Sequence, residues 1–240
     1  MIRFSINPKT VYIKKVDMER ALLIKKIIGI VINAFVFVSS MVILISGVVF
    51  GYNSFKGTFQ GGPNISYIKY FTTLSNAFNG FVALFILVLL IKHFKEDIIY
   101  PKWIKLLLLA STTSVALTFL TVLFFLAPTY ISYGYSFFYM YQNDMFFLHF
   151  FNPLLSFLFF AFLFKGEKIN PKECLFALIP MGLYSIVYSI NVISGIWEDF
   201  YGFTFGGKYY LAIIVLPIMF AVTYLTAFFT NLLSSKINKV

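Results

Sequence analysis

The strongest constraint on the fold is a repeated pattern of long apolar runs separated by short polar connections. The hydrocarbon core of a bilayer is about 30 Å thick, so a helix needs about 20 mostly apolar residues to cross it. The chain contains six such runs, at residues 24–51, 68–93, 103–126, 143–164, 174–195 and 209–233. A composition with 60% hydrophobic and only 12% charged residues also lies outside the range of soluble domains. We therefore predict an all-α, polytopic membrane protein with six transmembrane helices, forming one domain over residues 1–240.

The net charge of +10 is distributed unevenly along the chain. Sixteen of the 19 Lys and Arg residues lie in the basic segment 1–23, at the start of the first run, in the second and fourth connections, or in the C-terminal tail. Because Lys and Arg concentrate on the cytoplasmic side of membrane proteins, we expect both termini in the cytoplasm. The charge then indicates topology and attraction to anionic lipid headgroups, and we expect no nucleic-acid partner.

Metal and disulfide chemistry find little support in the sequence. A single cysteine, Cys174, forms no disulfide framework, and one Cys with two His cannot build a familiar zinc site. We expect no metal and no cofactor. The first apolar run is too long for the core of a cleavable signal, so we expect it to stay as a membrane anchor.

Polar side chains form stripes in three of the runs. Residues four apart, or three apart, share one face of a helix. The stripes are Thr72, Asn76 and Asn79 in the second run, His149, Asn152 and Ser156 in the fourth, and Tyr184, Tyr188 and Asn191 in the fifth. Since the second and fourth runs both enter from the outer side, Thr72 and His149 are expected at a comparable depth.

The stripes suggest a catalytic pair. An ionisable side chain within a membrane span is costly, which makes His149 a functional candidate. A threonine hydroxyl becomes a useful nucleophile when a neighbouring base takes its proton, and histidine suits that role near neutral pH. Thr72 and His149 would fill these roles, although Thr73 is adjacent and the residues alone do not choose between the two threonines.

Other members of the stripes are candidates for supporting roles. The amides of Asn76 or Asn152 would donate hydrogen bonds to the oxyanion of a tetrahedral intermediate. Tyr188 or Asn191 would orient the imidazole. The alternative is structural, because Ser, Thr and Asn in membrane helices mostly link helices to one another.

Two motifs carry a resemblance to a known family. The stretch Lys69-Tyr70-Phe71-Thr72-Thr73-Leu74-Ser75-Asn76, followed two runs later by His149-Phe150-Phe151-Asn152-Pro153, resembles the androgen-induced and androgen-dependent membrane protein family and its bacterial relatives. The characterised animal members of that family are intramembrane threonine hydrolases that cleave fatty acid esters of hydroxy fatty acids. The resemblance implies that Thr72 is the nucleophile and His149 the base.

The chain also departs from that family pattern. The aromatic segment from Trp197 to Phe205 is similar to a Tyr- and Pro-rich segment of the bacterial relatives, but it lacks the prolines. No acidic residue follows soon after the histidine motif. These differences leave the substrate preference open.

The favoured function is hydrolysis, or acyl transfer, of a membrane lipid or fatty acid ester near the outer leaflet. The Lys-, Ile- and Phe-rich composition suggests a bacterial source, and so a plasma membrane. One alternative is a six-span protein that captures or transports a small solute, and another is a purely structural protein. The acyl chain length, the alcohol portion, the final acceptor and the oligomeric state stay open.

Overall fold

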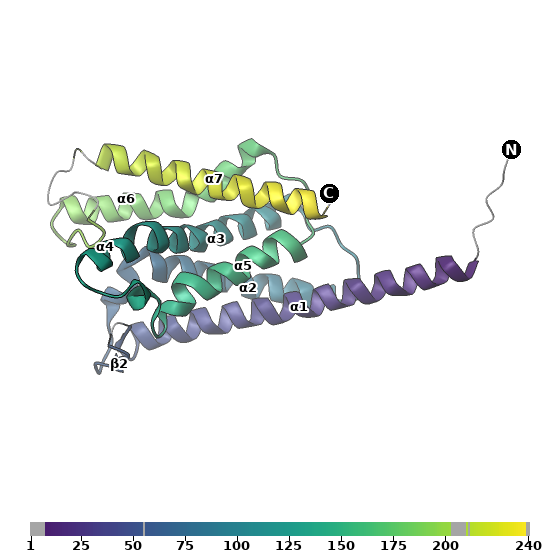
Figure 1. Cartoon of the computed structure of the whole chain (residues 1–240), viewed down its shortest axis with the longest axis horizontal. Helices are drawn as coiled ribbons and strands as arrows, with labels where there is room; N and C mark the ends of the chain where they lie inside the picture. The colour runs from purple at the N-terminus through teal and green to yellow at the C-terminus, as the bar shows by residue number, and fades with distance from the viewer. Residues whose placement is uncertain (1–7, 55, 203–209, 211, 239–240) are drawn as a thin grey trace.

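Long helices that run roughly parallel to one another form the body of the molecule (Figure 1). The computed structural model describes residues 8–54, 56–202, 210 and 212–238. The long helices are α1 (Pro8–Val48), α2 (Phe71–Lys92), α3 (Lys102–Thr121), α6 (Ile179–Ile193) and α7 (Ala212–Asn238). Within these residues the only strands are β1 (Tyr52–Asn53) and β2 (Thr58–Phe59), which pair antiparallel with Tyr52 opposite Phe59. The all-α prediction is therefore confirmed.

Five helical stretches of the described chain are long and apolar enough to cross a membrane. They are Met18–Val48, Phe71–Lys92, Lys102–Ser132, Pro171–Ile193 and Ile213–Asn238. The predicted fourth run is represented by a shorter apolar helix, Phe147–Leu163. At 1.5 Å per residue this helix is about 25 Å long, somewhat less than the thickness of the hydrocarbon core. The length and composition of these helices confirm the prediction of a helical membrane protein.

Three prolines mark places where the helices change geometry. Pro128, Pro153 and Pro180 lie in the first turns of α4 (Ala127–Ser132), α5 (Asn152–Leu158) and α6. Each of these helices directly follows a non-α segment: the π-helical η2 (Val122–Leu126), the π-helical η4 (Phe147–Phe151) and the 3₁₀-helical η6 (Pro171–Leu178). Proline has no N–H for the carbonyl four residues earlier, so the preceding turn widens or tightens.

The boundaries of the third and fourth runs follow from these turns. Because Pro128 is accommodated by η2, the third run continues to Ser132, and Tyr130 lies in a helix rather than in the predicted loop. Pro153 is likewise preceded by the π-helical turn η4, which contains His149. The remaining short helices are η1 (Ile65–Lys69), η3 (Phe137–Tyr141) and η5 (Phe159–Leu163).

The apolar core lies around α3, between α2, η5 and α7. Its fully buried members include Ile86, Leu109 and Phe160. Small residues of α1 and α2 allow close contacts at the edge of this core: a Cβ on Gly29 would lie 2.9 Å from the Phe159 ring, and one on Gly80 would lie 2.8 Å from Ser40. Small residues commonly allow such close packing between membrane helices.

Three hydroxyl groups of α3 have structural partners, whereas those of Thr112 and Thr113 are buried without one among the described residues. Ser111, Ser114 and Thr118 donate hydrogen bonds to carbonyl groups of their own helix at 2.8 to 3.3 Å. Thr118 also shares a hydrogen bond with Ser75 of α2 at 3.1 Å. These contacts satisfy polar groups that would otherwise be costly in an apolar environment.

Both ends of the described chain lie toward the same end of the bundle (Figure 1). The first turns of α1 project beyond the other helices there, and α7 ends nearby at Asn238. The basic segment 1–23 therefore continues into α1 from Pro8 onward, while residues 1–7 lie outside the described residues.

Candidate active site

Thr72 and His149 lie on the wall of the same cavity. This cavity has a volume of about 320 Å³ and lies at the end of the bundle that is opposite to the termini. It is surrounded by residues 52–54 of the hairpin that β1 and β2 form, by η1, by the start of α2, and by η3 and η4. The second and fourth predicted runs thus bring the predicted nucleophile and base to one place, although no hydrogen bond joins their side chains within the described chain.

The imidazole of His149 is held by the main chain. Its ring is only 4% exposed, and Nδ1 lies 2.6 Å from the carbonyl oxygen of Met140 in η3. A carbonyl oxygen can only accept, so in the neutral ring we assign the proton to Nδ1, leaving the lone pair on Nε2. Nε2 has no hydrogen-bond partner in the part of the chain that the structure describes. The Tyr141 ring packs nearby in a T-shaped arrangement, at a centroid distance of 6.5 Å.

Thr72 lies in the first turn of α2 and borders two cavities. In addition to the larger cavity, it lines a second cavity of about 100 Å³. Thr73 is 4% exposed and lines only the larger one. The carbonyl of Thr72 accepts hydrogen bonds from Asn76 at 2.9 Å and from Ser75 at 3.1 Å, which fixes this turn.

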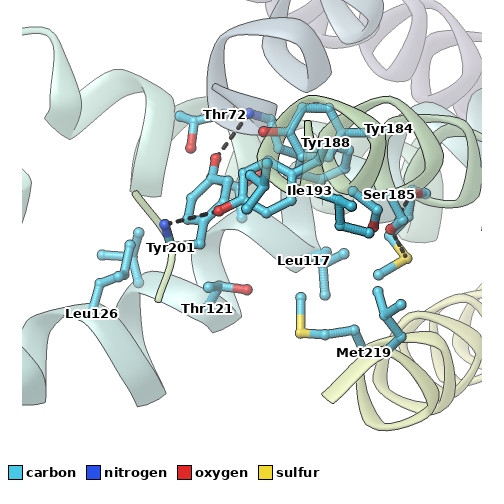
Figure 2. Close-up of a pocket in the computed structure, with 17 residues that line it drawn as sticks. Thr72, Leu117, Thr121, Leu126, Tyr184, Ser185, Tyr188, Ile193, Tyr201 and Met219 are labelled. Carbon is cyan, nitrogen blue, oxygen red and sulfur yellow. Dashed lines mark hydrogen bonds between the residues drawn. The ribbon is translucent and has the colours of Figure 1, made fainter. Parts of the chain in front are cut away.

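The second cavity is mainly apolar and lies between α3, α6 and α7. Its walls include Leu117, Met181, Leu216 and Met219, and Figure 2 shows Thr72 at its edge. The cavity is bounded by side chains that face one another across three helices. Such a surface suits a hydrocarbon chain.

Tyr201 lies at the boundary between the two cavities and lines both of them. Its hydroxyl oxygen accepts the amide hydrogen of Phe71 at 2.9 Å, and its own amide donates to the Tyr188 hydroxyl at 3.3 Å (Figure 2). Burial raises the pKa of Tyr201 to about 12. The phenol is therefore neutral at physiological pH and ties the loop after α6 to the start of α2.

Asn76 and Asn152 pair with each other instead of facing a cavity. Asn152 Nδ2 donates to Asn76 Oδ1 at 3.2 Å and to Ser40 at 3.3 Å, while Asn152 Oδ1 accepts from Ser39 at 2.8 Å. Asn76 Nδ2 donates to the carbonyl groups of Thr72 and Leu148. Both hydrogens of each amide are thus engaged. The structure gives these two residues a role in joining α1, α2 and α5, and leaves no amide hydrogen for an oxyanion.

Tyr188 and Asn191 do not contact His149. The Tyr188 hydroxyl donates to Asp199 Oδ1 at 2.5 Å. Asn191 donates to the carbonyl of Val187 in its own helix at 2.8 Å. The group that orients the imidazole is the Met140 carbonyl, which has no signature in the sequence because every residue carries a carbonyl.

A polar cluster above the larger cavity was not singled out by the sequence. Asp144 Oδ2 accepts hydrogen bonds from Ser54 at 2.7 Å and from Tyr67 at 2.9 Å, and Ser54 and Tyr67 both line the cavity. Burial, and then the Asp144 carboxylate, raise the pKa of Tyr67, so its phenol remains a donor. The cluster joins the hairpin, η1 and the loop before η4. Its one signal in the sequence is that Asp144 is the sole acidic residue of its loop.

Comparisons with known proteins add no relative. No family model, no curated protein and no solved structure matches the chain. Within the described residues, no group of three or more His, Cys, Asp and Glu side chains is placed to hold a metal ion. Phe203 and Phe205, which belong to the aromatic segment discussed above, lie outside the described residues.

Proposed function

We propose that this protein is an intramembrane hydrolase or acyltransferase that acts on a lipid ester, with Thr72 as nucleophile and His149 as base. The observation that carries the proposal is the position of Thr72, which borders a cavity shared with His149 and also an apolar cavity. The family resemblance of the two motifs supports the same assignment. Of the two adjacent threonines, Thr72 is favoured because it alone borders both cavities.

The chemistry follows from these positions. His149 Nε2 takes the proton of the Thr72 hydroxyl as its oxygen attacks the ester carbonyl, giving a tetrahedral intermediate. The intermediate collapses to an acyl-threonine, and the leaving alkoxide takes the proton from His149. Water, or a second alcohol, then attacks the acyl group while His149 takes its proton, and the departing Thr72 oxygen receives that proton, which restores the hydroxyl. Hydrogen bonds between such groups are often absent before the substrate binds, which accords with the missing contact between Thr72 and His149.

The first turn of α2 supplies a candidate for the oxyanion site. The helix makes its first internal hydrogen bond from the Leu74 amide to the Tyr70 carbonyl at 3.2 Å. The amides of Phe71, Thr72 and Thr73 thus have no acceptor in their own helix. Phe71 donates to the Tyr201 phenol oxygen, and the Thr72 amide also interacts with that oxygen. The Thr73 amide lies beside them at the positive end of the helix dipole, where negative charge is stabilised. We assign it the role that the sequence suggested for Asn76 or Asn152.

The two cavities suggest how the ester is oriented. The acyl chain occupies the apolar cavity between α3, α6 and α7, and the alcohol portion occupies the larger cavity. This places the carbonyl carbon at Thr72, where the cavities meet. The acyl chain enters laterally from the lipid phase.

The proposal includes a membrane topology. We infer six spans, with Phe147–Leu163 as the fourth, both termini in the cytoplasm and the site near the outer leaflet of a bacterial plasma membrane. The concentration of lysines at the end of the bundle that holds both termini supports this orientation.

A solute-binding protein is the second candidate, and the polar lining of the larger cavity favours it. Asn53, Ser54 and Asn64 line that cavity together with several tyrosines. Binding alone predicts that Thr72→Ala weakens solute affinity modestly. Catalysis predicts that the same change abolishes turnover while the protein stays folded.

The deciding experiment labels the purified protein in detergent with a fluorophosphonate probe and maps the adduct by mass spectrometry. We expect an adduct on Thr72 that is lost in His149→Ala and retained in the matched control Thr73→Ala. An adduct on Thr73 would reassign the nucleophile. The absence of any adduct from a folded protein would contradict an activated threonine and favour solute binding.

A further inference from the structure

A third cavity lies at the other end of the bundle, where the end of α7 approaches α1. It has a volume of about 540 Å³. The start of the apolar part of α1, the connection between α2 and α3, the end of η5 and the end of α7 form its walls. It shares no lining residue with the candidate active site.

The rim of this cavity carries an excess of positive charge. Four lysines line it, against two carboxylates, Glu19 and Asp97; the lysines are Lys25, Lys26, Lys95 and Lys165. Asp97 is already paired with Lys165, whose Nζ lies 2.9 Å from its carboxylate. Lys25 and Lys95 are exposed and have neither an ion pair nor a hydrogen bond within the described residues.

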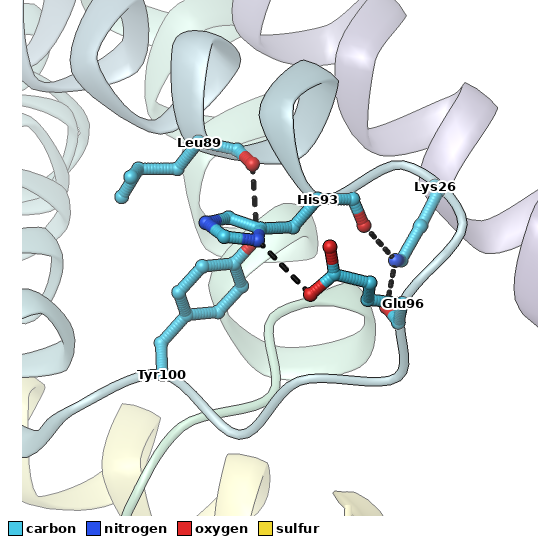
Figure 3. A network of polar contacts seen from close by, with 5 residues as sticks. All are labelled: Lys26, Leu89, His93, Glu96 and Tyr100. Atoms are coloured by element: carbon cyan, nitrogen blue, oxygen red, sulfur yellow. Dashed lines mark hydrogen bonds and ion pairs between the residues drawn. The ribbon is translucent and has the colours of Figure 1, made fainter.

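The wall beside these lysines is fixed by a polar network (Figure 3). Lys26 Nζ donates to the carbonyl groups of His93, at 2.5 Å, and of Glu96. His93 Nδ1 lies 3.2 Å from Glu96 Oε2, and the Tyr100 hydroxyl donates to the Leu89 carbonyl. An ammonium group here also complements the negative end of the α2 dipole. The network therefore holds one positive charge at the cavity while leaving Lys25 and Lys95 to bind a ligand.

The floor of the cavity is apolar. Leu90, Phe159 and Phe164 line it and are almost fully buried, and Leu22 and Leu163 extend the apolar surface toward the lipid-facing side of α1 and η5. A basic rim above an apolar floor, at the end of the membrane-crossing helices, matches a molecule with an anionic head and a hydrocarbon chain. A free phosphate would leave the floor uncovered.

We propose that this cavity binds an anionic phospholipid of the adjacent leaflet. Its phosphate lies between the ammonium groups of Lys25 and Lys95 and the N–H of Lys26 that the network leaves free. Its acyl chain lies against Phe159 and Leu163. Basic cavities between membrane helices are suited to such headgroups. The lipid then bridges α1, the connection after α2, and the end of α7.

Native mass spectrometry of the purified full-length protein in detergent tests this proposal. Phosphatidylglycerol and phosphatidylcholine are titrated separately, and inorganic phosphate is added as a competitor. The test variant is Lys25→Gln/Lys95→Gln. The matched control, Lys168→Gln/Lys172→Gln, removes the same charge from exposed lysines at the same end but outside the cavity.

We expect phosphatidylglycerol to bind the native protein more tightly than phosphatidylcholine. Loss of a lysine near a phosphate costs about fivefold in affinity, so the test variant should bind about 30-fold more weakly and the control within about twofold of the native protein. Equal weakening in both variants would overturn the proposal in favour of diffuse charge attraction. Equal affinity for the two lipids, or displacement by inorganic phosphate at the concentration of the lipid, would also overturn it.

Discussion

Replacement of Asn152 by alanine tests the packing role that the structure gives to this residue. The change removes the hydrogen bonds to Ser39, Ser40 and Asn76, which link α5 to α1 and α2. Asn152 is fully buried, so water cannot replace the lost partners. The side-chain oxygen of Asn76 would lose the hydrogen bond that it accepts from Asn152.

The expected loss follows from the number of bonds. Hydrogen bonds between membrane helices contribute about 0.6 kcal/mol each on average, so three of them give about 2 kcal/mol. The cost at Ser39 is slightly smaller, because its hydroxyl also donates to the Val36 carbonyl at 3.2 Å and keeps that partner in the variant. We therefore expect Asn152→Ala to lower the free energy of unfolding by about 2 kcal/mol.

Reversible unfolding in mixed micelles, with increasing SDS, measures this difference. Two matched controls calibrate it. Asn79→Ala removes a single bond between helices, to Ser156 at 2.7 Å, and should cost about 0.6 kcal/mol. Asn191→Ala removes only a bond within its own helix and should change the free energy of unfolding by less than about 0.5 kcal/mol.

Two results would refute this reasoning. A loss for Asn152→Ala no larger than that for Asn191→Ala would show that the network does not stabilise the bundle. A full loss of ester turnover at an unchanged free energy of unfolding would show that Asn152 acts on the substrate, as the sequence alone suggested. Turnover that falls only in proportion to the folded fraction agrees with packing.

Two further predictions concern the space around the site. Gly47→Ala should lower the free energy of unfolding by about 1 to 3 kcal/mol in the same assay, because its Cβ would lie 2.4 Å from the Tyr67 ring. The control Gly182→Ala, whose Cβ would have its nearest neighbour at 3.6 Å, should be nearly neutral. Equal effects of the two changes would contradict the packing argument. Leu216→Trp should fill the apolar cavity and lower kcat/KM at least tenfold more for long-chain than for short-chain esters, since each methylene is worth about 0.8 kcal/mol. A uniform decrease for all chain lengths would place the acyl chain elsewhere.

The sequence predicted the helices better than their ends. Apolar length identified α2 to within three residues at its start and one at its end, because a bilayer imposes a minimum length on any span. It did not predict that the third run continues to Ser132, since the widened turn η2 accommodates Pro128. Whether a helix continues past a proline through such a turn depends on the elements packed around it, which the local sequence does not reveal.

The candidate site was predictable in part. The depth and face of Thr72 and His149 follow from helical periodicity, and these two residues do line one cavity. The roles of Asn76 and Asn152 could not be predicted, because the choice between facing a cavity and facing a neighbouring helix depends on the rotation of each helix. The Met140 carbonyl that holds His149 is invisible to a search for side-chain chemistry.

The position of Thr72 between two unlike compartments has a kinetic consequence for the proposed reaction. Once the alcohol has departed, the acyl group remains bound in the apolar compartment, and only the polar compartment is vacated. The second reactant must therefore arrive through the space that the first product left. Its polar lining, with Tyr67 and His149, selects between water and another alcohol, so the partition between hydrolysis and acyl transfer is decided there rather than by the acyl chain.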